Sequence, residues 1–199
     1  MAALTDEELN AYRQDGYVVP SFRLDPDRIA GLVEELDRVI AVNPGVRPEK
    51  LISIHLENGA EGVKGARAFL DLAHDPDILD LVEAAIGPDI ALWGCHMFCK
   101  AAGDGLETPW HQDGHYWPIR PLATCTVWVA LERSGPENGC LRVVPGSHAE
   151  GRLHAHMKED GPLALSEKID MSAFAEDDAV DIVLEPGQMS LHDVYMIHG

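Results

Sequence analysis

Apolar residues in roughly the first 90 positions recur with the period of an α-helix. A capping box at Thr5–Glu8 opens one expected helix, which ends at Gly16. Tyr17–Pro20 then favours a short strand. Asp25-Pro26 and Asp75-Pro76 each place Pro in the first turn of a further helix. The first of these two carries a stripe of Ile29, Leu32, Val33, Leu36 and Ile40, and the second ends at Gly87-Pro88.

From residue 90 onward the pattern changes to short apolar runs that are typical of strands. The expected strands are Ile90–Lys100, Ala123–Leu131, Cys140–Val144, Val180–Leu184 and Met189–Ile197. Turn residues separate them, among them Pro136-Glu137-Asn138-Gly139 and Glu185-Pro186-Gly187. Helices followed by strands predict an α+β, mainly β fold with a jelly-roll core, a double-stranded β-helix of the cupin kind, and N-terminal helices packed on it.

The same pattern predicts one domain over residues 1–199, with a helical part at about 1–89 and the jelly-roll core at 90–199. Residues 149–179 have no clear period and are highly charged. A loop of that length in a compact domain is usually functional or disordered, so a lid over a site is one interpretation.

Composition narrows the classes of partner. The formal net charge of −19 would be repelled by a nucleic-acid backbone or an anionic membrane surface, so neither is an expected partner. No basic segment followed by an apolar one marks a signal peptide at the N-terminus, and no apolar stretch approaches membrane-spanning length. The four Cys form no CxxC pair and lie in apolar runs. Free thiols in a reducing compartment are expected, and hence a soluble, cytoplasmic protein with oligomeric state unknown.

Candidate chemistry gathers around His111-Gln112-Asp113. In a strand, residues two apart point to the same side, so His111 and Asp113 can reach one ion. Two imidazoles and one carboxylate form the facial triad of non-haem iron enzymes, which leaves coordination positions open. The second imidazole must come from a distant strand. His192 and His198 both qualify on spacing alone, since an unbroken strand would point them to one side.

Several motifs, in order, resemble the phytanoyl-CoA dioxygenase family. They are His111–Pro118, Trp128, Asn138–Leu141, Pro145–His148, Pro186-Gly187 and His198-Gly199. The resemblance covers most of residues 90–199 and fits the N-terminal part more loosely. It implies an enzyme that uses Fe(II), 2-oxoglutarate and O2 to hydroxylate a C–H bond of a small molecule, releasing succinate and carbon dioxide. It also implies that His111, Asp113 and His198 are the metal ligands and catalytic residues, because the family's ligand directly precedes Gly.

The resemblance assigns further roles. Trp128, Met97 and Lys100 are expected to border 2-oxoglutarate, with Lys100 offering a cation to a carboxylate. Family members that halogenate lack the carboxylate ligand, so Asp113 favours hydroxylation. His192 becomes a structural neighbour, and His115 is expected to lie at the substrate entrance without binding metal. Trp110, Tyr116 and Trp117 could either wall a substrate pocket or fill the core.

The family also places an Arg shortly beyond the last iron ligand, where its guanidinium pairs with the far carboxylate of 2-oxoglutarate. No such position follows Gly199, so we expect this sequence to be part of a longer chain. Two alternatives stay open. One is a cupin-like metal enzyme without 2-oxoglutarate, for which His154 and His156 supply the only HxH spacing. The other is a non-catalytic binding or regulatory jelly-roll domain.

Overall fold

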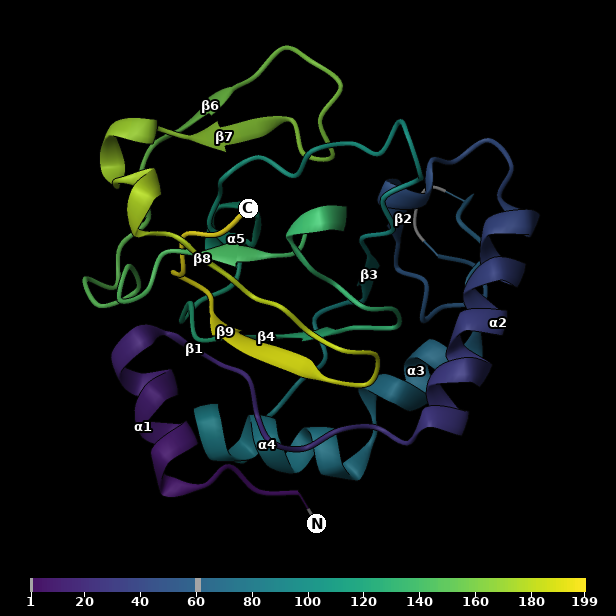
Figure 1. The fold of residues 1–199 in the computed structure, drawn as a ribbon, viewed down its shortest axis with the longest axis horizontal. Helices are drawn as coiled ribbons and strands as arrows, with labels where there is room; N and C mark the ends of the chain where they lie inside the picture. The colour runs from purple at the N-terminus through teal and green to yellow at the C-terminus, as the bar shows by residue number, and fades with distance from the viewer. Residues whose placement is uncertain (1, 60–61) are drawn as a thin grey trace.

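In the computed structural model, which describes residues 2–59 and 62–199, helices surround a small antiparallel sheet (Figure 1). The helices are α1 Asp6–Asp15, α2 Pro26–Val42, α3 Arg67–Ala73, α4 Pro76–Ile86 and the single-turn α5 Asp113–Tyr116. Short 3₁₀ turns lie at Pro48–Lys50, Pro136–Asn138, Met171–Ala173 and Glu176–Asp178. The expected caps are present: Thr5 forms a capping box with Glu8, and Gly16 ends α1 in the left-handed conformation, at φ 80°.

The strands are short. They are β1 Tyr17–Val18, β2 Leu51–Ile52, β3 His96–Met97, β4 Cys125–Val129, β5 Arg142–Val143, β6 His156–Lys158, β7 Glu167–Ile169, β8 Val180–Asp181 and β9 Met189–Asp193. The main sheet has the order β1-β9-β4, and the pairs β2-β3, β5-β8 and β6-β7 complete the pairing. All of these pairs are antiparallel. The architecture confirms the predicted α+β jelly-roll class with N-terminal helices packed on the strands.

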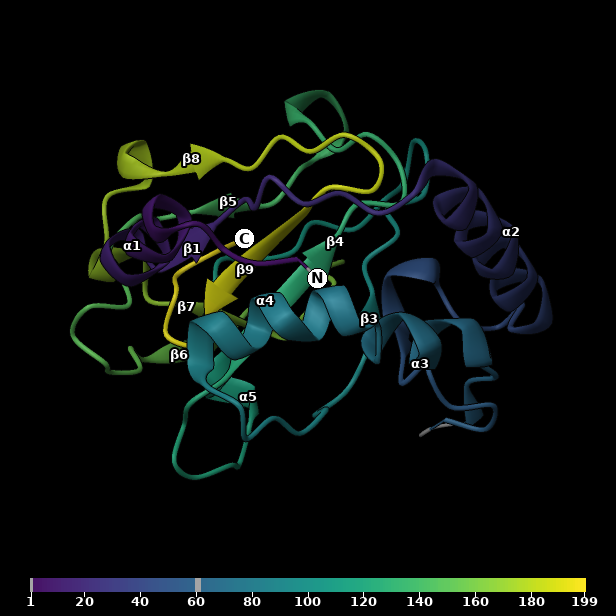
Figure 2. The same cartoon turned by 90° about the horizontal axis from the view of Figure 1, so that it is seen from below.

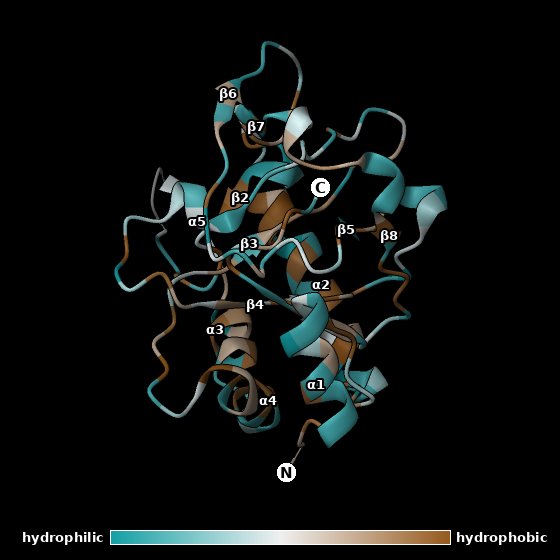
Figure 3. Ribbon diagram, turned by 90° about the vertical axis from the view of Figure 1, so that its left-hand side faces the viewer, coloured by the Kyte–Doolittle hydropathy of each residue, from teal (hydrophilic) through white to brown (hydrophobic). Residues whose placement is uncertain are grey.

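The N-terminal helices cover one face of the β1-β9-β4 sheet. Figure 2 shows α4 running across β4 and β9, and α1 packs beside β1. Leu81 of α4 and Leu191 of β9 are both fully buried at 0% exposure in the same core. In Figure 3, α1 is largely hydrophilic whereas α2 mixes apolar and polar positions, which matches its buried stripe of Ile29, Leu32 and Val39. The helices therefore support the sheet from which the site is built.

The expected strands are longer than the observed ones, and the largest differences concern a strand and a loop. The strand expected over Ile90–Lys100 is reduced to His96–Met97, because Leu92 and Trp93 lie on the surface at 43% and 53% exposure without a partner strand. The expected loop at 149–179 contains the β6-β7 hairpin, seen at the top of Figure 1. Within the described residues, no helix has both the length and the apolar character needed to cross a bilayer.

Candidate metal centre

His111 and His198 are brought together by their backbones. Each donates its N–H to the carbonyl of the other, at 2.8 and 3.0 Å, so they form a hydrogen-bonded pair of an antiparallel bridge. Val143 bridges His198 on its other side. The two imidazole rings lie 4.1 Å apart between centroids, and both residues are buried. Long-range pairing, which the sequence spacing does not reveal, therefore determines the distance between the two rings.

Both imidazoles direct the same nitrogen toward the site. The Nδ1 of His111 lies 2.8 Å from the carbonyl of Pro109, and the Nδ1 of His198 lies 3.0 Å from the carbonyl of Met196. A carbonyl oxygen only accepts, so each Nδ1 carries the hydrogen, and in a neutral ring Nε2 keeps its lone pair. In metal-binding histidines, a hydrogen bond from the ring nitrogen that does not bind the metal orients the ring in this way.

Asp113 completes the group, although not from a strand as expected. Gln112 is extended, but Asp113 is the first residue of the helical turn α5. The turn still directs the carboxylate inward: its Oδ1 lies 3.7 Å from the Nε2 of His111 and 3.7 Å from the Nε2 of His198. The three candidate ligand atoms lie within 4.8 Å of one another, and the group is the one of this kind found within residues 2–59 and 62–199. Two imidazoles and a carboxylate on one side fit a divalent iron ion.

The protonation states also suit a cation. Burial alone would raise the pKa of the Asp113 carboxyl, but His198, His111 and His192 around it hold that pKa well below its usual range. Burial, followed by the neighbouring His111, lowers the pKa of His198 well below its usual value. An ionised carboxylate beside a neutral imidazole is the form in which both groups bind a metal.

Gln112 anchors the segment between the two ligands. Its side chain is completely buried and makes three hydrogen bonds: it donates to the carbonyls of Arg152 and Tyr195 and accepts from the N–H of His154. These bonds attach the His111–Asp113 segment to two distant parts of the chain. The middle residue of the motif is therefore a structural element of the site, a role that the sequence did not indicate.

The β6-β7 hairpin packs against α5. His115 contacts the Glu167 carboxylate through Nε2 and stacks on His156, with ring centroids 3.9 Å apart. The Nδ1 of His156 lies 3.0 Å from the carbonyl of His154, and its Nε2 accepts the N–H of Gln112. His156 thus has both ring nitrogens engaged, and His115 has its Nε2 engaged by Glu167. The HxH pair proposed for a cupin-like alternative therefore offers no free nitrogen from His156.

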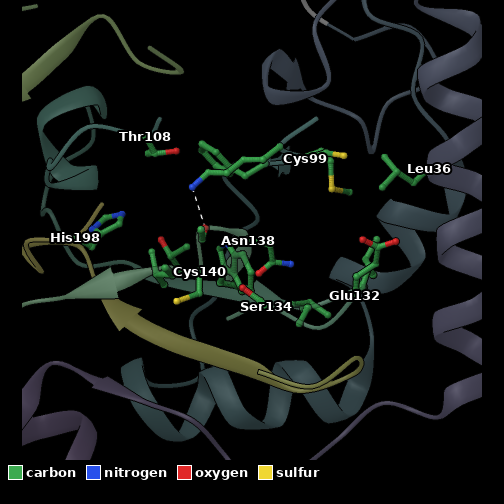
Figure 4. Close-up of a pocket in the computed structure, with 18 of the residues that line it drawn as sticks. Leu36, Cys99, Thr108, Glu132, Ser134, Asn138, Cys140 and His198 are labelled. Atoms are coloured by element: carbon green, nitrogen blue, oxygen red, sulfur yellow. Dashed lines mark hydrogen bonds between the residues drawn. The ribbon is translucent and has the colours of Figure 1, made fainter. Parts of the chain in front are cut away.

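A pocket of about 280 Å³ opens beside the three candidate ligands. Figure 4 shows His198 toward one end, with Cys99, Leu36 and Glu132 toward the other. The residues predicted from the resemblance to border 2-oxoglutarate, Met97, Lys100 and Trp128, all line it. The Lys100 ammonium donates to the carbonyl of Gly139 at 2.9 Å, the bond drawn dashed in Figure 4.

The aromatic residues of the motif separate into two groups. Trp110 is buried at 7% exposure, packs 5.1 Å from Phe174 and belongs to a core cluster. Tyr116 lies beside the centre, with its ring 5.9 Å from that of His111, and Trp117 packs against the exposed Trp93 at 6.5 Å. Trp110 therefore fills the core, whereas Tyr116 lies beside the candidate metal ligand His111 and Trp117 pairs with an exposed Trp93.

Comparison with known proteins points to the same family by sequence and by fold. The family model described as phytanoyl-CoA dioxygenase (PhyH) matches residues 12–199. The chain is 30% identical over 218 residues to the peroxisomal phytanoyl-CoA dioxygenase of Homo sapiens. The matched region covers 98% of this chain and 63% of the human protein. The chain therefore spans less than two thirds of the length of that relative.

Two solved structures share the fold. The apo form of the non-heme monooxygenase ThoJ is 29% identical, with a TM-score of 0.77 over 96% of this chain and 69% of ThoJ. The epimerase SnoN, solved in complex with Fe3+, alpha ketoglutarate and nogalamycin RO, is 24% identical, with a TM-score of 0.73 over 97% of this chain and 74% of SnoN. With a family match over nearly all of its length and this fold, the chain belongs to the phytanoyl-CoA dioxygenase family.

Proposed function

We propose that this protein is an Fe(II)- and 2-oxoglutarate-dependent dioxygenase that hydroxylates a C–H bond of a small molecule. The observation that carries the proposal is the convergence of His111, Asp113 and His198, with both imidazole Nε2 atoms and one carboxylate oxygen directed at one point. Membership of the phytanoyl-CoA dioxygenase family supports the same chemistry.

In this proposal the three side chains are the iron ligands and bind one side of the ion, as in other facial triads. Bound there, iron with 2-oxoglutarate and O2 supplies the oxidising chemistry, in which a C–H bond and the keto acid become an alcohol, succinate and carbon dioxide. One oxygen atom of O2 enters the alcohol and the other enters succinate. The protein's share is to position the reactants and to limit the access of water, since His111 and His198 are both buried.

The pocket beside the triad is the proposed binding site for 2-oxoglutarate. Trp128 and Met97 supply apolar walls, and Lys100 is the one Lys or Arg among the residues found to line this pocket in the described part of the chain. An ammonium has three donors, and the bond to Gly139 uses one of them. Lys100 can therefore still donate to a carboxylate, which makes it a proposed co-substrate residue.

Replacing Lys100 with Ala should weaken 2-oxoglutarate binding. A charge-assisted hydrogen bond contributes about 1.5–3 kcal/mol, which corresponds to an increase in the KM for 2-oxoglutarate of about 10- to 100-fold. Metal affinity should not change, because Lys100 contacts none of the three ligands. Steady-state succinate assays over a range of 2-oxoglutarate concentrations measure the effect, with Lys158→Ala, on the exposed β6 strand, as the control. An unchanged KM would remove Lys100 from the binding site.

The substrate is proposed to be a small organic molecule that approaches past Tyr116 and Trp117. The ring of Tyr116 provides apolar contact surface beside His111, and Trp117, four residues after Asp113, adds a second aromatic surface together with Trp93. The net charge of −19 is unfavourable for a highly phosphorylated partner, so an acyl-CoA is not the favoured substrate.

The test is product formation by the whole natural chain. Succinate should appear only when Fe(II), 2-oxoglutarate and O2 are all supplied, and omission of any one should reduce it to background. Calorimetric titration of 2-oxoglutarate into Mn(II)-loaded protein separates the alternatives. Binding of 2-oxoglutarate supports the proposed co-substrate site even where no tested small molecule is hydroxylated. Absence of binding with metal present would favour a non-catalytic jelly-roll domain and refute the proposal.

A further inference from the structure

The two oxygens of the Asp113 carboxylate have different surroundings. Oδ1 faces His111 and His198, at 3.7 Å from each Nε2. Oδ2 points the other way and accepts two hydrogen bonds, from the hydroxyl of Thr126 at 2.6 Å and from the Nε2 of His192 at 3.3 Å. One oxygen is thus available to a metal, and the other is occupied by donors of the protein.

These two donors come from the main sheet. Thr126 on β4 and His192 on β9 are directly opposite each other in the antiparallel register. His192 is 1% exposed, and β9 is the central strand, between β1 and β4. Asp113, in contrast, lies on the single helical turn α5. The sheet is therefore the rigid support that fixes how the carboxylate of this turn is rotated.

We propose that Thr126 and His192 are positioning residues that restrain Oδ2, so that Asp113 offers Oδ1 alone to the metal. This inference rests on the proposed function. A carboxylate that is free to rotate can bind a cation through both oxygens. In a facial triad the second oxygen would take a coordination position that the co-substrate and O2 require. Thr126 and His192 act through Asp113, and neither needs to touch the metal.

The hydrogen positions on His192 support this role. Its Nε2 faces a carboxylate oxygen that can only accept, so Nε2 carries a hydrogen and donates it to Oδ2. The Nδ1 is buried and has no hydrogen-bond partner in the protein. His192 therefore contributes to the site through one nitrogen. If Gln replaced His192, its amide nitrogen would lie near the position of Nε2 and could still donate. The amide of the shorter Asn would lie near the position of Nδ1 instead.

The chain offers two matched pairs of variants. Thr126→Val removes the hydroxyl at nearly constant shape, and Thr126→Ser retains it. His192→Gln keeps a donor near the Nε2 position, and His192→Asn does not. Apo protein of each variant is titrated with Co(II), and both the affinity and the visible spectrum of bound Co(II) are recorded. The spectrum reports the number and arrangement of ligands without any turnover.

We expect Thr126→Val and His192→Asn to lower Co(II) affinity by about 10- to 100-fold, the usual effect of losing a hydrogen bond to a metal ligand. Their spectra should shift toward a higher coordination number. Thr126→Ser and His192→Gln should restore both affinity and spectrum to near the native values. Circular dichroism and thermal melting of each apo variant show whether it is folded, and if Thr126→Val is not, the His192 pair decides.

Native affinity and an unchanged spectrum in Thr126→Val and His192→Asn would overturn the inference. So would a Thr126→Ser variant as impaired as Thr126→Val, because the hydroxyl that Ser retains would then not be sufficient to hold the carboxylate. Failure of the proposed function gives a different result: native protein would bind Co(II) in a manner that depends on Asp113, yet form no succinate under any condition.

Discussion

Asp113→Ala should abolish 2-oxoglutarate turnover and weaken iron binding by more than about 100-fold, because loss of a ligand costs at least as much as loss of a residue that orients one. The carboxylate is the single anionic member of the group, and its Oδ1 lies 3.7 Å from both imidazole Nε2 atoms. Without it, two neutral nitrogens alone would face a divalent cation. Succinate formation and Fe(II) titration under anaerobic conditions measure the two effects.

Asp37→Ala is the matched control, since Asp37 is a carboxylate at the α2 side of the same pocket. It should leave iron affinity near the native value, because none of the three candidate ligands is changed. Full activity in Asp113→Ala would exclude the three-residue centre from the chemistry, whatever the control shows.

Gln112→Ala should reduce the free energy of unfolding by about 2–5 kcal/mol and lower metal affinity as well. Removing its buried side chain leaves two part-buried carbonyls and one part-buried N–H without their partner, and an unsatisfied group costs up to about 1–3 kcal/mol when it is buried. The same bonds fix the backbone between His111 and Asp113, so the ligands would also lose orientation. Urea denaturation of apo protein and Co(II) titration measure the two effects.

Gln188→Ala provides the comparison, because the side chain of Gln188 accepts one exposed hydrogen bond, from the N–H of Glu185. Its effect on stability should stay below about 1 kcal/mol. If Gln112→Ala were no more destabilising than Gln188→Ala, the three side-chain hydrogen bonds of Gln112 would not be what supports the metal segment.

Local signals account for what the sequence predicted well. The capping box at Thr5, the left-handed Gly16 and the Pro residues that open α2 and α4 act within a few residues, so the chain itself specifies these helix ends. The α+β jelly-roll class followed from helical periodicity giving way to short strands. Met97, Lys100 and Trp128, which the family resemblance assigns to 2-oxoglutarate, line the pocket beside the triad, and their part in binding it stays a prediction.

Long-range contacts account for what the sequence did not reveal. The strand pattern at Ile90–Lys100 cannot show that Trp93 lacks a partner strand, and no period in 149–179 indicates the β6-β7 hairpin. Thr126 was not recognised, because the sequence of a strand does not show which of its two faces lies against Asp113. Its register opposite His192, which is a property of the folded sheet, is what identifies it.

The most direct test is a crystal structure of the whole natural chain with Mn(II) and 2-oxoglutarate under anaerobic conditions. We predict one metal ion bound by the Nε2 of His111, the Nε2 of His198 and the Oδ1 of Asp113, with 2-oxoglutarate beside it in the pocket that Lys100 and Trp128 line. A metal ion bound elsewhere, or an ion from which His198 is turned away, would contradict it.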